Sequence, residues 1–305
     1  PRSTLFPYTT LFRSPSLKSS GFGTIDFRFP ISALFWECRP PPGPRFMNPL
    51  PLPDLSARLR PPITSITAYD YPTARLCDEA GIQLILVGDS LGMMVAGYED
   101  TTSVTLEQMV YHTSIVRRGV KRAIVLADLP IHTYDNPGDA LASARRIADA
   151  GADAVKLEGG REQIPQVEAI VGAGIPVCAH LGMLPQRVRE EGGYKKKGRS
   201  ESEARSLVDA ALALEAAGAF AVVLESVVAD VAAEITDRLT IPTIGIGSGH
   251  HCDGQVRVVH DVTGGFPWFV PPFAKTHGDV AGVTRKALSA FLEEVGDSHR
   301  TGFPE

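Results

Sequence analysis

Cysteine is scarce in this chain, and none of its cysteines stands at a spacing that binds zinc or builds a disulfide framework. Cys38, Cys77, Cys178 and Cys252 are scattered along the 305 residues, so no C-x-x-C pair occurs. We expect these thiols to be reduced and mostly buried, which is typical of a cytoplasmic protein.

A long apolar run and an excess of positive charge are also missing. No apolar segment approaches the roughly 20 residues that cross a bilayer. The 30 Lys and Arg against 35 Asp and Glu give a net charge of −5, which favours neither nucleic acid nor an anionic membrane surface. With 44% hydrophobic and 21% charged residues, the composition is typical of a soluble globular protein.

Composition changes sharply near Met47. Seven of the thirteen Phe residues precede it, without any helical or strand periodicity to use them. Residues 4–14 resemble the in-frame translation of a sequencing-adapter oligonucleotide. We therefore expect residues 1–46 to be a disordered, non-native extension, Met47 to be the native start and residues 47–305 to form one catalytic domain.

From Met47 onward, apolar β-type runs alternate with helical segments. The expected strands cover residues 62–68, 84–89, 123–128, 154–158, 176–180, 219–225, 242–247 and 268–271. The expected helices cover residues 71–80, 106–118, 137–150, 161–171, 202–217, 228–239, 254–262 and 279–295. Repeated βα alternation predicts a parallel sheet, and no G-x-G-x-x-G follows the first strand. The pattern therefore favours a closed (β/α)₈ TIM barrel over an open doubly wound sheet.

Five of the strand-like runs end on a charged or imidazole side chain. These end residues are Asp89, Asp128, Glu158, His180 and Glu225. The carboxyl ends of barrel strands converge on one point, and an unpaired buried carboxylate is costly, so we expect the group to share a partner. Oxygen ligands without a His or Cys cluster favour a hard cation, Mg²⁺ before Zn²⁺.

Each polar strand end also has a plainer interpretation. Asp89 and Glu225 could cap the helices that follow them, and Asp128 could be a turn residue before Pro130. His180 alone could be a hydrogen-bonded histidine of the core.

Lys156 and Glu158 lie two residues apart, so their side chains share one face of a strand. They could form an ion pair with each other. Alternatively, Lys156 could hold a substrate carboxylate and Glu158 a metal-bound water.

Ten short motifs, taken together and in order from Ile63 to Phe273, resemble the ketopantoate hydroxymethyltransferase family. They are Thr67-Ala-Tyr-Asp-Tyr71, Val87-Gly-Asp-Ser-Leu-Gly92, Tyr111-His-Thr113, Ala127-Asp-Leu-Pro130, Lys156-Leu-Glu-Gly-Gly160, His180-Leu-Gly182, Gly192-Gly-Tyr194, Leu224-Glu-Ser226, Gly245-Ile-Gly247 and His260-Asp261.

The resemblance implies a (β/α)₈ barrel that moves a one-carbon unit from 5,10-methylenetetrahydrofolate to 3-methyl-2-oxobutanoate. The product would be 2-dehydropantoate, formed through a Mg²⁺-stabilised enolate in pantothenate synthesis. The resemblance assigns the Mg²⁺ ligands to Asp89, Asp128 and Glu158, the general base to Glu225, and oxo-acid binding to Asp89, Ser90, Asp128, Lys156 and His180. Family members form homo-oligomers (decamers), so we expect a homo-oligomer with small-molecule substrates.

Two other functions fit the same polar strand ends. One is a different Mg²⁺-dependent aldolase or lyase of 2-oxo acids, which would not need folate. The other is a non-catalytic barrel that binds an acidic metabolite, which would keep ligand binding after loss of Glu225.

We predict that a chain beginning at Met47 keeps the stability and activity of the full chain, because residues 1–46 offer no periodic apolar face to bury. Thermal denaturation and a turnover assay on both chains would check this. A substantial drop in melting temperature for the shorter chain would contradict it.

Overall fold

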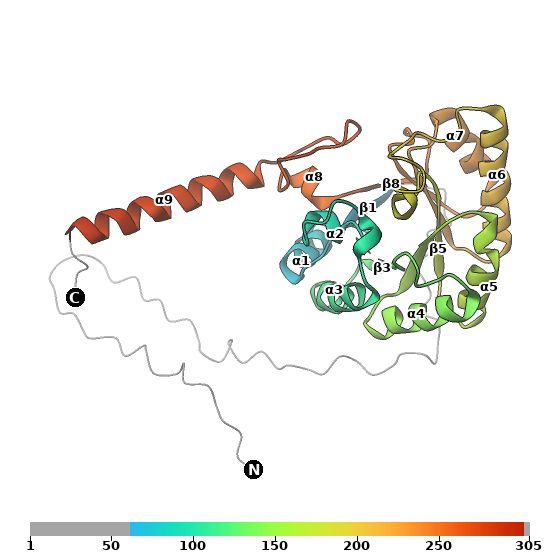
Figure 1. Cartoon of the computed structure of the whole chain (residues 1–305), viewed down its shortest axis with the longest axis horizontal. Coiled ribbons are helices and arrows are strands. Elements are labelled where there is room, and N and C mark those ends of the chain that lie inside the picture. The colour runs from blue at the N-terminus through green and yellow to red at the C-terminus, as the bar shows by residue number, and fades with distance from the viewer. Residues whose placement is uncertain (1–61, 302–305) are drawn as a thin grey trace, which may run out of the picture. The chain divides into compact units, whose positions relative to one another are not determined.

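Eight parallel strands close into a barrel in the computed structural model (Figure 1). The structure describes residues 62–301, so the expected extension over residues 1–46 lies outside the described residues. The strands are β1 (Ile63–Thr67), β2 (Leu84–Val87), β3 (Ile124–Asp128), β4 (Ala154–Glu158), β5 (Val177–Gly182), β6 (Ala221–Glu225), β7 (Thr243–Ile246) and β8 (Gly254–Arg257). Each strand pairs with the next, and β8 closes the barrel against β1. The predicted (β/α)₈ barrel is confirmed.

Helices follow every strand except β7, which leads directly to β8, and α1 to α7 lie around the barrel (Figure 1). They are α1 (Tyr71–Glu79), α2 (Leu91–Met94), α3 (Leu106–Gly119), α4 (Pro137–Asp149), α5 (Ile164–Gly172), α6 (Glu201–Ala216), α7 (Ala229–Arg238), α8 (Val259–Thr263) and α9 (Val280–Thr301). Several begin at a side chain that accepts a hydrogen bond from the first turn, as Asp70 does for α1 and Asn136 for α4. Between residues 62 and 301, no helix has the length and apolarity that spanning a membrane requires.

Alternation along the strands separates two apolar layers. On β2, Ile85 and Val87 pack outward against the helices, whereas Leu84 and Leu86 fill the barrel interior. The interior layer consists of Ile63, Leu84, Leu86, Ile124, Leu126, Ala154, Cys178, Ala221, Val223, Ile244 and Val256. Since strand side chains alternate with period two, every second residue after an interior position also faces inward.

This alternation determines where the polar residues at the ends of the strands lie. Asp128 continues the inward series of Ile124 and Leu126 on β3, and Glu225 continues that of Ala221 and Val223 on β6. By the same count, Lys156 and Glu158 follow Ala154, and His180 follows Cys178. The polar side chains therefore lie above the apolar interior, at the carboxyl end of the barrel.

The eighth strand is not where the sequence suggests it. The expected helix over residues 254–262 and strand over residues 268–271 are both wrong, because residues 254–257 form β8 and α8 follows. A Cβ on Gly254 would lie 2.6 Å from the Ile63 carbonyl oxygen, so barrel closure requires a glycine at this position. A glycine interrupts the apolar pattern from which a strand is predicted. Trp268, at the expected strand, is 76% exposed. The other seven strands agree with expectation within two residues.

We predict that Gly182→Ala destabilises the barrel. Gly182 has φ 101°, and an added Cβ would collide with the Glu225 carbonyl oxygen, to which the Met183 N–H donates at 2.8 Å. The backbone conformation alone should cost about 1–2 kcal/mol, and the collision adds to this cost and displaces the end of β6. Urea unfolding measures the loss.

Gly172→Ala is the matched control. Gly172 ends α5 and has no neighbouring atom within 4 Å of an added Cβ, so alanine should be neutral or stabilise by up to about 1 kcal/mol. Equal free energies of unfolding for the two variants would show that the close approach at Gly182 has no energetic weight.

Candidate functional site

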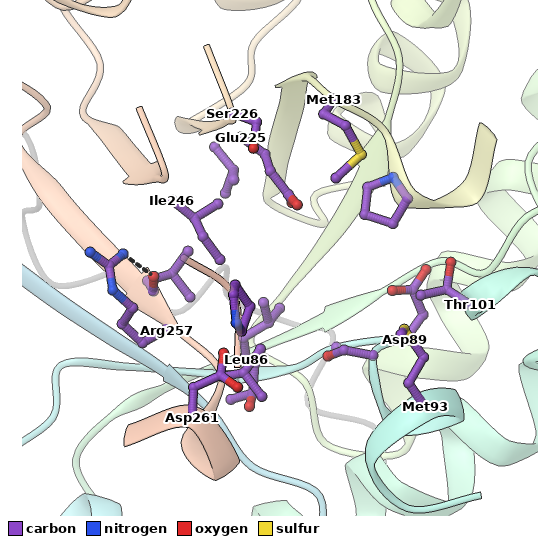
Figure 2. A pocket seen from close by; sticks show the side chains of 18 of the residues that line it. Leu86, Asp89, Met93, Thr101, Met183, Glu225, Ser226, Ile246, Arg257 and Asp261 are labelled. Atoms are coloured by element: carbon purple, nitrogen blue, oxygen red, sulfur yellow. Dashed lines mark hydrogen bonds between the residues drawn. The ribbon is translucent and has the colours of Figure 1, made fainter. Parts of the chain in front are cut away.

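A cavity of about 290 Å³ opens at the carboxyl ends of the strands. Figure 2 shows Asp89, Glu225 and Asp261 around it, reaching it from different parts of the barrel. All seven site residues expected from the sequence line this one cavity: Asp89, Ser90, Asp128, Lys156, Glu158, His180 and Glu225. Residues more than 130 positions apart thus meet at a single place.

A buried ion pair forms the floor of the site. Lys156 Nζ lies 2.8 Å from Asp128 Oδ1, and both side chains are 5% exposed or less. The β3–β4 register places the two residues directly opposite each other. Burial lowers the pKa of Lys156, but the charges of Asp128, Glu158 and Asp89 outweigh it and hold that pKa above its ordinary value. Lys156 is therefore a cation whose closest acidic partner is Asp128, and the ion pair within β4 is not the pairing that forms.

Asp89 carries an unfavourable charge in this setting. Its backbone N–H donates to Asp128 Oδ2 at 3.0 Å, which brings the two carboxylates together. Burial, followed by the charges of Asp128 and Glu158, raises the pKa of Asp89 well above its ordinary value. A cation beside these carboxylates would remove the repulsion.

The oxygen atoms fit a hard cation. Asp128 Oδ1 and Glu158 Oε1 are buried and face only Lys156 and His180, and carboxylate oxygens are the ligands that Mg²⁺ prefers. Among residues 62–301, no three His, Cys, Asp or Glu side chains are already gathered closely enough to enclose an ion. This agrees with Mg²⁺ sites in general, where one or two carboxylates act together with water and substrate oxygens.

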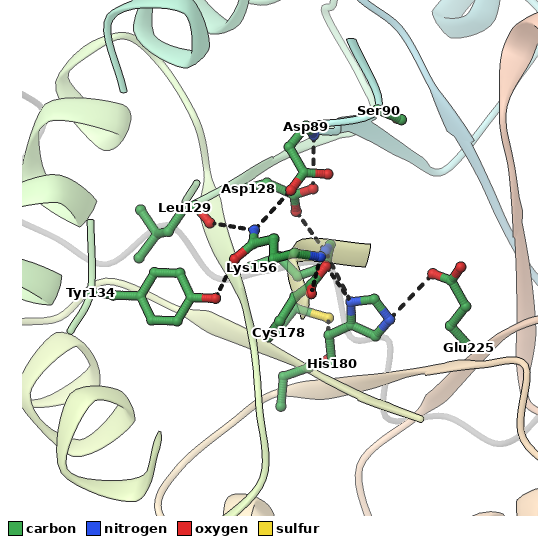
Figure 3. Close-up of polar contacts among 12 residues, drawn as sticks. Asp89, Ser90, Asp128, Leu129, Tyr134, Lys156, Cys178, His180 and Glu225 are labelled. Atoms are coloured by element: carbon green, nitrogen blue, oxygen red, sulfur yellow. Dashed lines mark hydrogen bonds and ion pairs between the residues drawn. The ribbon is translucent and has the colours of Figure 1, made fainter. Parts of the chain in front are cut away.

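His180 lies between two carboxylates, and Figure 3 shows its contact with one of them, Glu225. Its Nδ1 is 3.4 Å from Glu158 Oε1, and its Nε2 is 3.4 Å from Glu225 Oε2. Burial and the Lys156 charge lower the pKa of His180, but Glu158 and Glu225 outweigh them and raise it to about 9. His180 is therefore an imidazolium at neutral pH and belongs to the site rather than to the apolar core.

The helix-capping interpretations of Asp89 and Glu225 are wrong. The residue before α2 is Ser90, and Val228 precedes α7; neither helix receives a side-chain cap. Glu225 instead points toward the cavity (Figure 2), with a side chain that is 16% exposed. Ser90 Oγ shares a 2.8 Å hydrogen bond with Tyr69 Oη at the edge of the cavity.

Two residues of the polar network carry no signal in the sequence pattern. Gln186 donates to Asp89 Oδ2 and to the Leu129 carbonyl oxygen, and Tyr134 donates to Gln186. Tyr69, which holds Ser90, does belong to the Thr67–Tyr71 motif. A glutamine in a turn and a lone tyrosine in a loop are common in any protein, so only their contacts reveal them.

Known proteins resemble the chain over most of its length. The sequence profile of the family described as ketopantoate hydroxymethyltransferase matches residues 52–305. The chain is 51% identical over 251 residues to the 3-methyl-2-oxobutanoate hydroxymethyltransferase of Oleidesulfovibrio alaskensis, covering 80% of this chain and 87% of the relative. It is 52% identical over 235 residues to the protein of the same name from Acetivibrio thermocellus, covering 76% and 83%.

Solved structures show the same fold at low sequence identity. A phosphonopyruvate hydrolase, solved with oxalate and Mg²⁺, superimposes with a TM-score of 0.51 at 15% identity and covers 79% of this chain and 83% of its own. An oxaloacetate acetylhydrolase, solved with its product oxalate, gives a TM-score of 0.54 at 14% identity, with coverage of 82% and 87%. At this identity, the likeness shows the barrel alone.

We predict opposite effects on metal-free stability for two aspartates. The raised pKa of Asp89 means that the native state binds this proton more tightly than the unfolded chain does. Its contribution therefore falls as pH rises above about 4, so Asp89→Asn should stabilise the protein at pH 7.5. Asp128→Asn leaves Lys156 buried without its ion-pair partner and should cost roughly 3–5 kcal/mol.

Urea unfolding in the presence of a chelator measures both changes. Asp209→Asn, on an exposed position of α6, is the control and should be neutral. Equal destabilisation by Asp89→Asn and Asp128→Asn would contradict the charge distribution described above.

Proposed function

The chain belongs to the ketopantoate hydroxymethyltransferase family, and from this we propose that the cavity at the barrel mouth is where it transfers a hydroxymethyl group to 3-methyl-2-oxobutanoate. Family membership makes the chain a hydroxymethyltransferase, which excludes a non-catalytic barrel. The convergence of carboxylates, Lys156 and His180 on one cavity carries the assignment of the site. The expected product is 2-dehydropantoate.

Asp89 and Asp128 are the residues that would hold Mg²⁺, with Glu158 completing the shell through a water molecule. The support for this is the raised pKa of Asp89 and the close approach of the buried Asp89 and Asp128 carboxylates. When bound, Mg²⁺ would neutralise these carboxylates and withdraw electrons from the keto group of the oxo acid.

The cations of the site suit an oxo acid. Lys156 and His180 both line the cavity and are both positively charged at neutral pH, so they attract the substrate carboxylate. Ser90 adds a hydroxyl, oriented by Tyr69. These groups would orient 3-methyl-2-oxobutanoate with its C3 hydrogen toward Glu225.

Glu225 is the proposed general base. Its carboxylate faces the cavity and lies 3.4 Å from His180 Nε2, so it can take the C3 proton while His180 orients it. Lys156 stabilises the negative charge that develops on the oxo-acid oxygen. The resulting carbon nucleophile then forms the new carbon–carbon bond to the one-carbon unit of 5,10-methylenetetrahydrofolate. Both carbon–nitrogen bonds of the methylene group break, water supplies the hydroxyl oxygen, and tetrahydrofolate leaves with the C3 proton and one proton from water on its nitrogens.

The outer part of the cavity suits a flat heteroaromatic ring such as the pterin of folate. Its lining is apolar and comes from α2, the loop after β5 and the segment after α8. The apolar lining residues there are Met93, Met94, Tyr194, Phe269, Pro271, Pro272 and Phe273. Aromatic and methionine side chains bind flat rings by stacking and through sulfur contacts. A folate-independent lyase would have no use for this wall, and dependence of 2-dehydropantoate formation on methylenetetrahydrofolate separates the two functions.

We also propose that the enzyme works in the cytoplasm as a homo-oligomer. Cys77, Cys178 and Cys252 are buried free thiols, which suits a reducing compartment. Helix α9 presents an exposed apolar stripe at helical spacing that a second copy of the chain would cover. The stripe consists of Val280, Val283, Leu288, Phe291, Leu292 and Val295. A monomeric mass in sedimentation equilibrium would contradict the oligomer.

Glu225→Gln tests the mechanism. The amide is nearly isosteric with the carboxylate, so oxo-acid binding should survive, but the amide cannot accept the C3 proton. We expect exchange of the C3 hydrogen into deuterated water, without folate, to slow by roughly 10²–10⁴-fold. Proton NMR follows the exchange, and calorimetry measures the binding.

Glu168→Gln, at an exposed position of α5, is the matched control and should exchange at the normal rate. If Glu225→Gln exchanges almost normally while binding the oxo acid, the base is another group, and His180 is the next to test.

A further inference from the structure

We propose that Gln186 is a positioning residue that holds two of the site carboxylates in place, and that Tyr134 holds the far end of its amide. This inference rests on the proposed metal site and adds two residues to it. Gln186 belongs to the short 3₁₀ turn Pro185–Arg187 that follows β5, and it is 2% exposed.

Gln186 binds carboxylates that come from two different strands. Its side-chain Nε2 donates to Asp89 Oδ2 at 2.8 Å. Its backbone N–H donates to Glu158 Oε2 at 3.1 Å. Asp89 follows β2 and Glu158 ends β4, so a single turn residue fixes the relative placement of the two acids.

The orientation of the Gln186 amide follows from the chemistry of its partners. The Leu129 carbonyl oxygen can only accept, and it lies 2.9 Å from the same end of the amide that meets Asp89. That end must therefore be the donating NH₂ group. At the other end, the Tyr134 hydroxyl donates to Oε1. A flipped amide would place an acceptor against both a carboxylate and a carbonyl, so Asp89 and Leu129 together exclude it, and the Tyr134 hydroxyl then donates to the Oε1 that they leave facing it.

Tyr134 is itself held in place. Its side chain is buried, and its backbone carbonyl accepts from Gln166 Nε2 at 3.2 Å. Hydrogen bonds therefore connect Gln166, Tyr134, Gln186 and Asp89 in series, and every donor in the series is uncharged.

Neutral donors are suited to this task. The amide restrains one oxygen of Asp89 and the backbone N–H restrains one oxygen of Glu158, while Glu158 Oε1 faces His180. An arginine or lysine in place of Gln186 would bring a full positive charge and compete with a bound cation. An uncharged donor restrains the carboxylates without that competition, which is how hydrogen bonds behind metal ligands raise affinity.

The test compares Mg²⁺ affinity with stability. Gln186→Met keeps the length of the side chain but removes the amide, and we expect it to raise the Mg²⁺ dissociation constant roughly 10–100-fold. Tyr134→Phe removes one hydroxyl and should raise it by a smaller factor. Titration calorimetry without substrate gives the affinities, and thermal unfolding in chelator gives the stability of each variant.

A second readout is the split between kinetic constants. The variants should need more Mg²⁺ for half-maximal turnover, whereas kcat at saturating Mg²⁺ should approach that of the wild type. Gln163→Met is the matched control, because Gln163 is a buried glutamine of the neighbouring turn Arg161–Gln163 with no hydrogen bond to the site carboxylates. It should keep its Mg²⁺ affinity and change stability little, because the buried Oε1 of Gln163 has no hydrogen-bond partner to lose.

The outcomes separate this inference from the proposed function. If the wild type binds Mg²⁺ and both Gln186→Met and Tyr134→Phe keep its affinity, Gln186 is merely structural and the inference is overturned, while the metal site stands. If the wild type binds no Mg²⁺ with or without oxo acid, the metal site fails and the inference fails with it. Should Gln186→Met not fold, the affinity of Tyr134→Phe decides.

Discussion

The ion pair between Asp128 and Lys156 is the interaction on which the rest of the site depends. It lies at the carboxyl end of the barrel interior, at 2.8 Å and almost out of reach of solvent. Asp89, Glu158 and Glu225 add three more carboxylates around this pair. They lie at or near the buried interior, where charge is poorly solvated. Lys156 and His180 offset part of this charge, and the remaining negative charge is the reason for the proposed Mg²⁺ site.

The barrel itself explains why these groups meet. Period-two alternation sends one series of side chains inward on every strand, and the inward series becomes polar in its last layer on β3, β4, β5 and β6. Below that layer the interior is apolar, and at the outer rim methionine, proline and aromatic side chains surround the cavity. Under the proposed function, the oxo acid would occupy the polar layer and the pterin ring of folate the rim.

Hydrogen bonds from the backbone and from neutral side chains also hold the site carboxylates in place. The Asp89 N–H binds Asp128, the Gln186 N–H binds Glu158, and the Gln186 amide binds Asp89. Each restrains a carboxylate without adding charge, so the ionic balance of the site is left to Lys156, His180 and a bound cation. Gly182 also shapes the site. Any side chain there would collide with the Glu225 carbonyl oxygen, so the glycine allows the end of β6 to lie close to β5.

Much of this could be predicted from the sequence alone. Apolar runs ending on Asp128, Glu158, His180 and Glu225 indicate both the parallel barrel and the acidic site, because strand period and strand polarity are local properties of the chain. The eighth strand could not be predicted, since Gly254 is required by the approach of Ile63 from the first strand, nearly the whole barrel away in sequence.

The partners within the site were also decided only by the tertiary structure. Lys156 pairs with Asp128 because the register of β3 and β4 sets them opposite each other, whereas its sequence neighbour Glu158 is the pairing that local spacing favours. Gln186 reaches Asp89 across 97 positions of sequence, and Tyr134 reaches Gln186 across 52. The sequence by itself determined which side chains point into the barrel, and barrel closure decided which of them touch, because contact between strands depends on register and not on spacing along one strand.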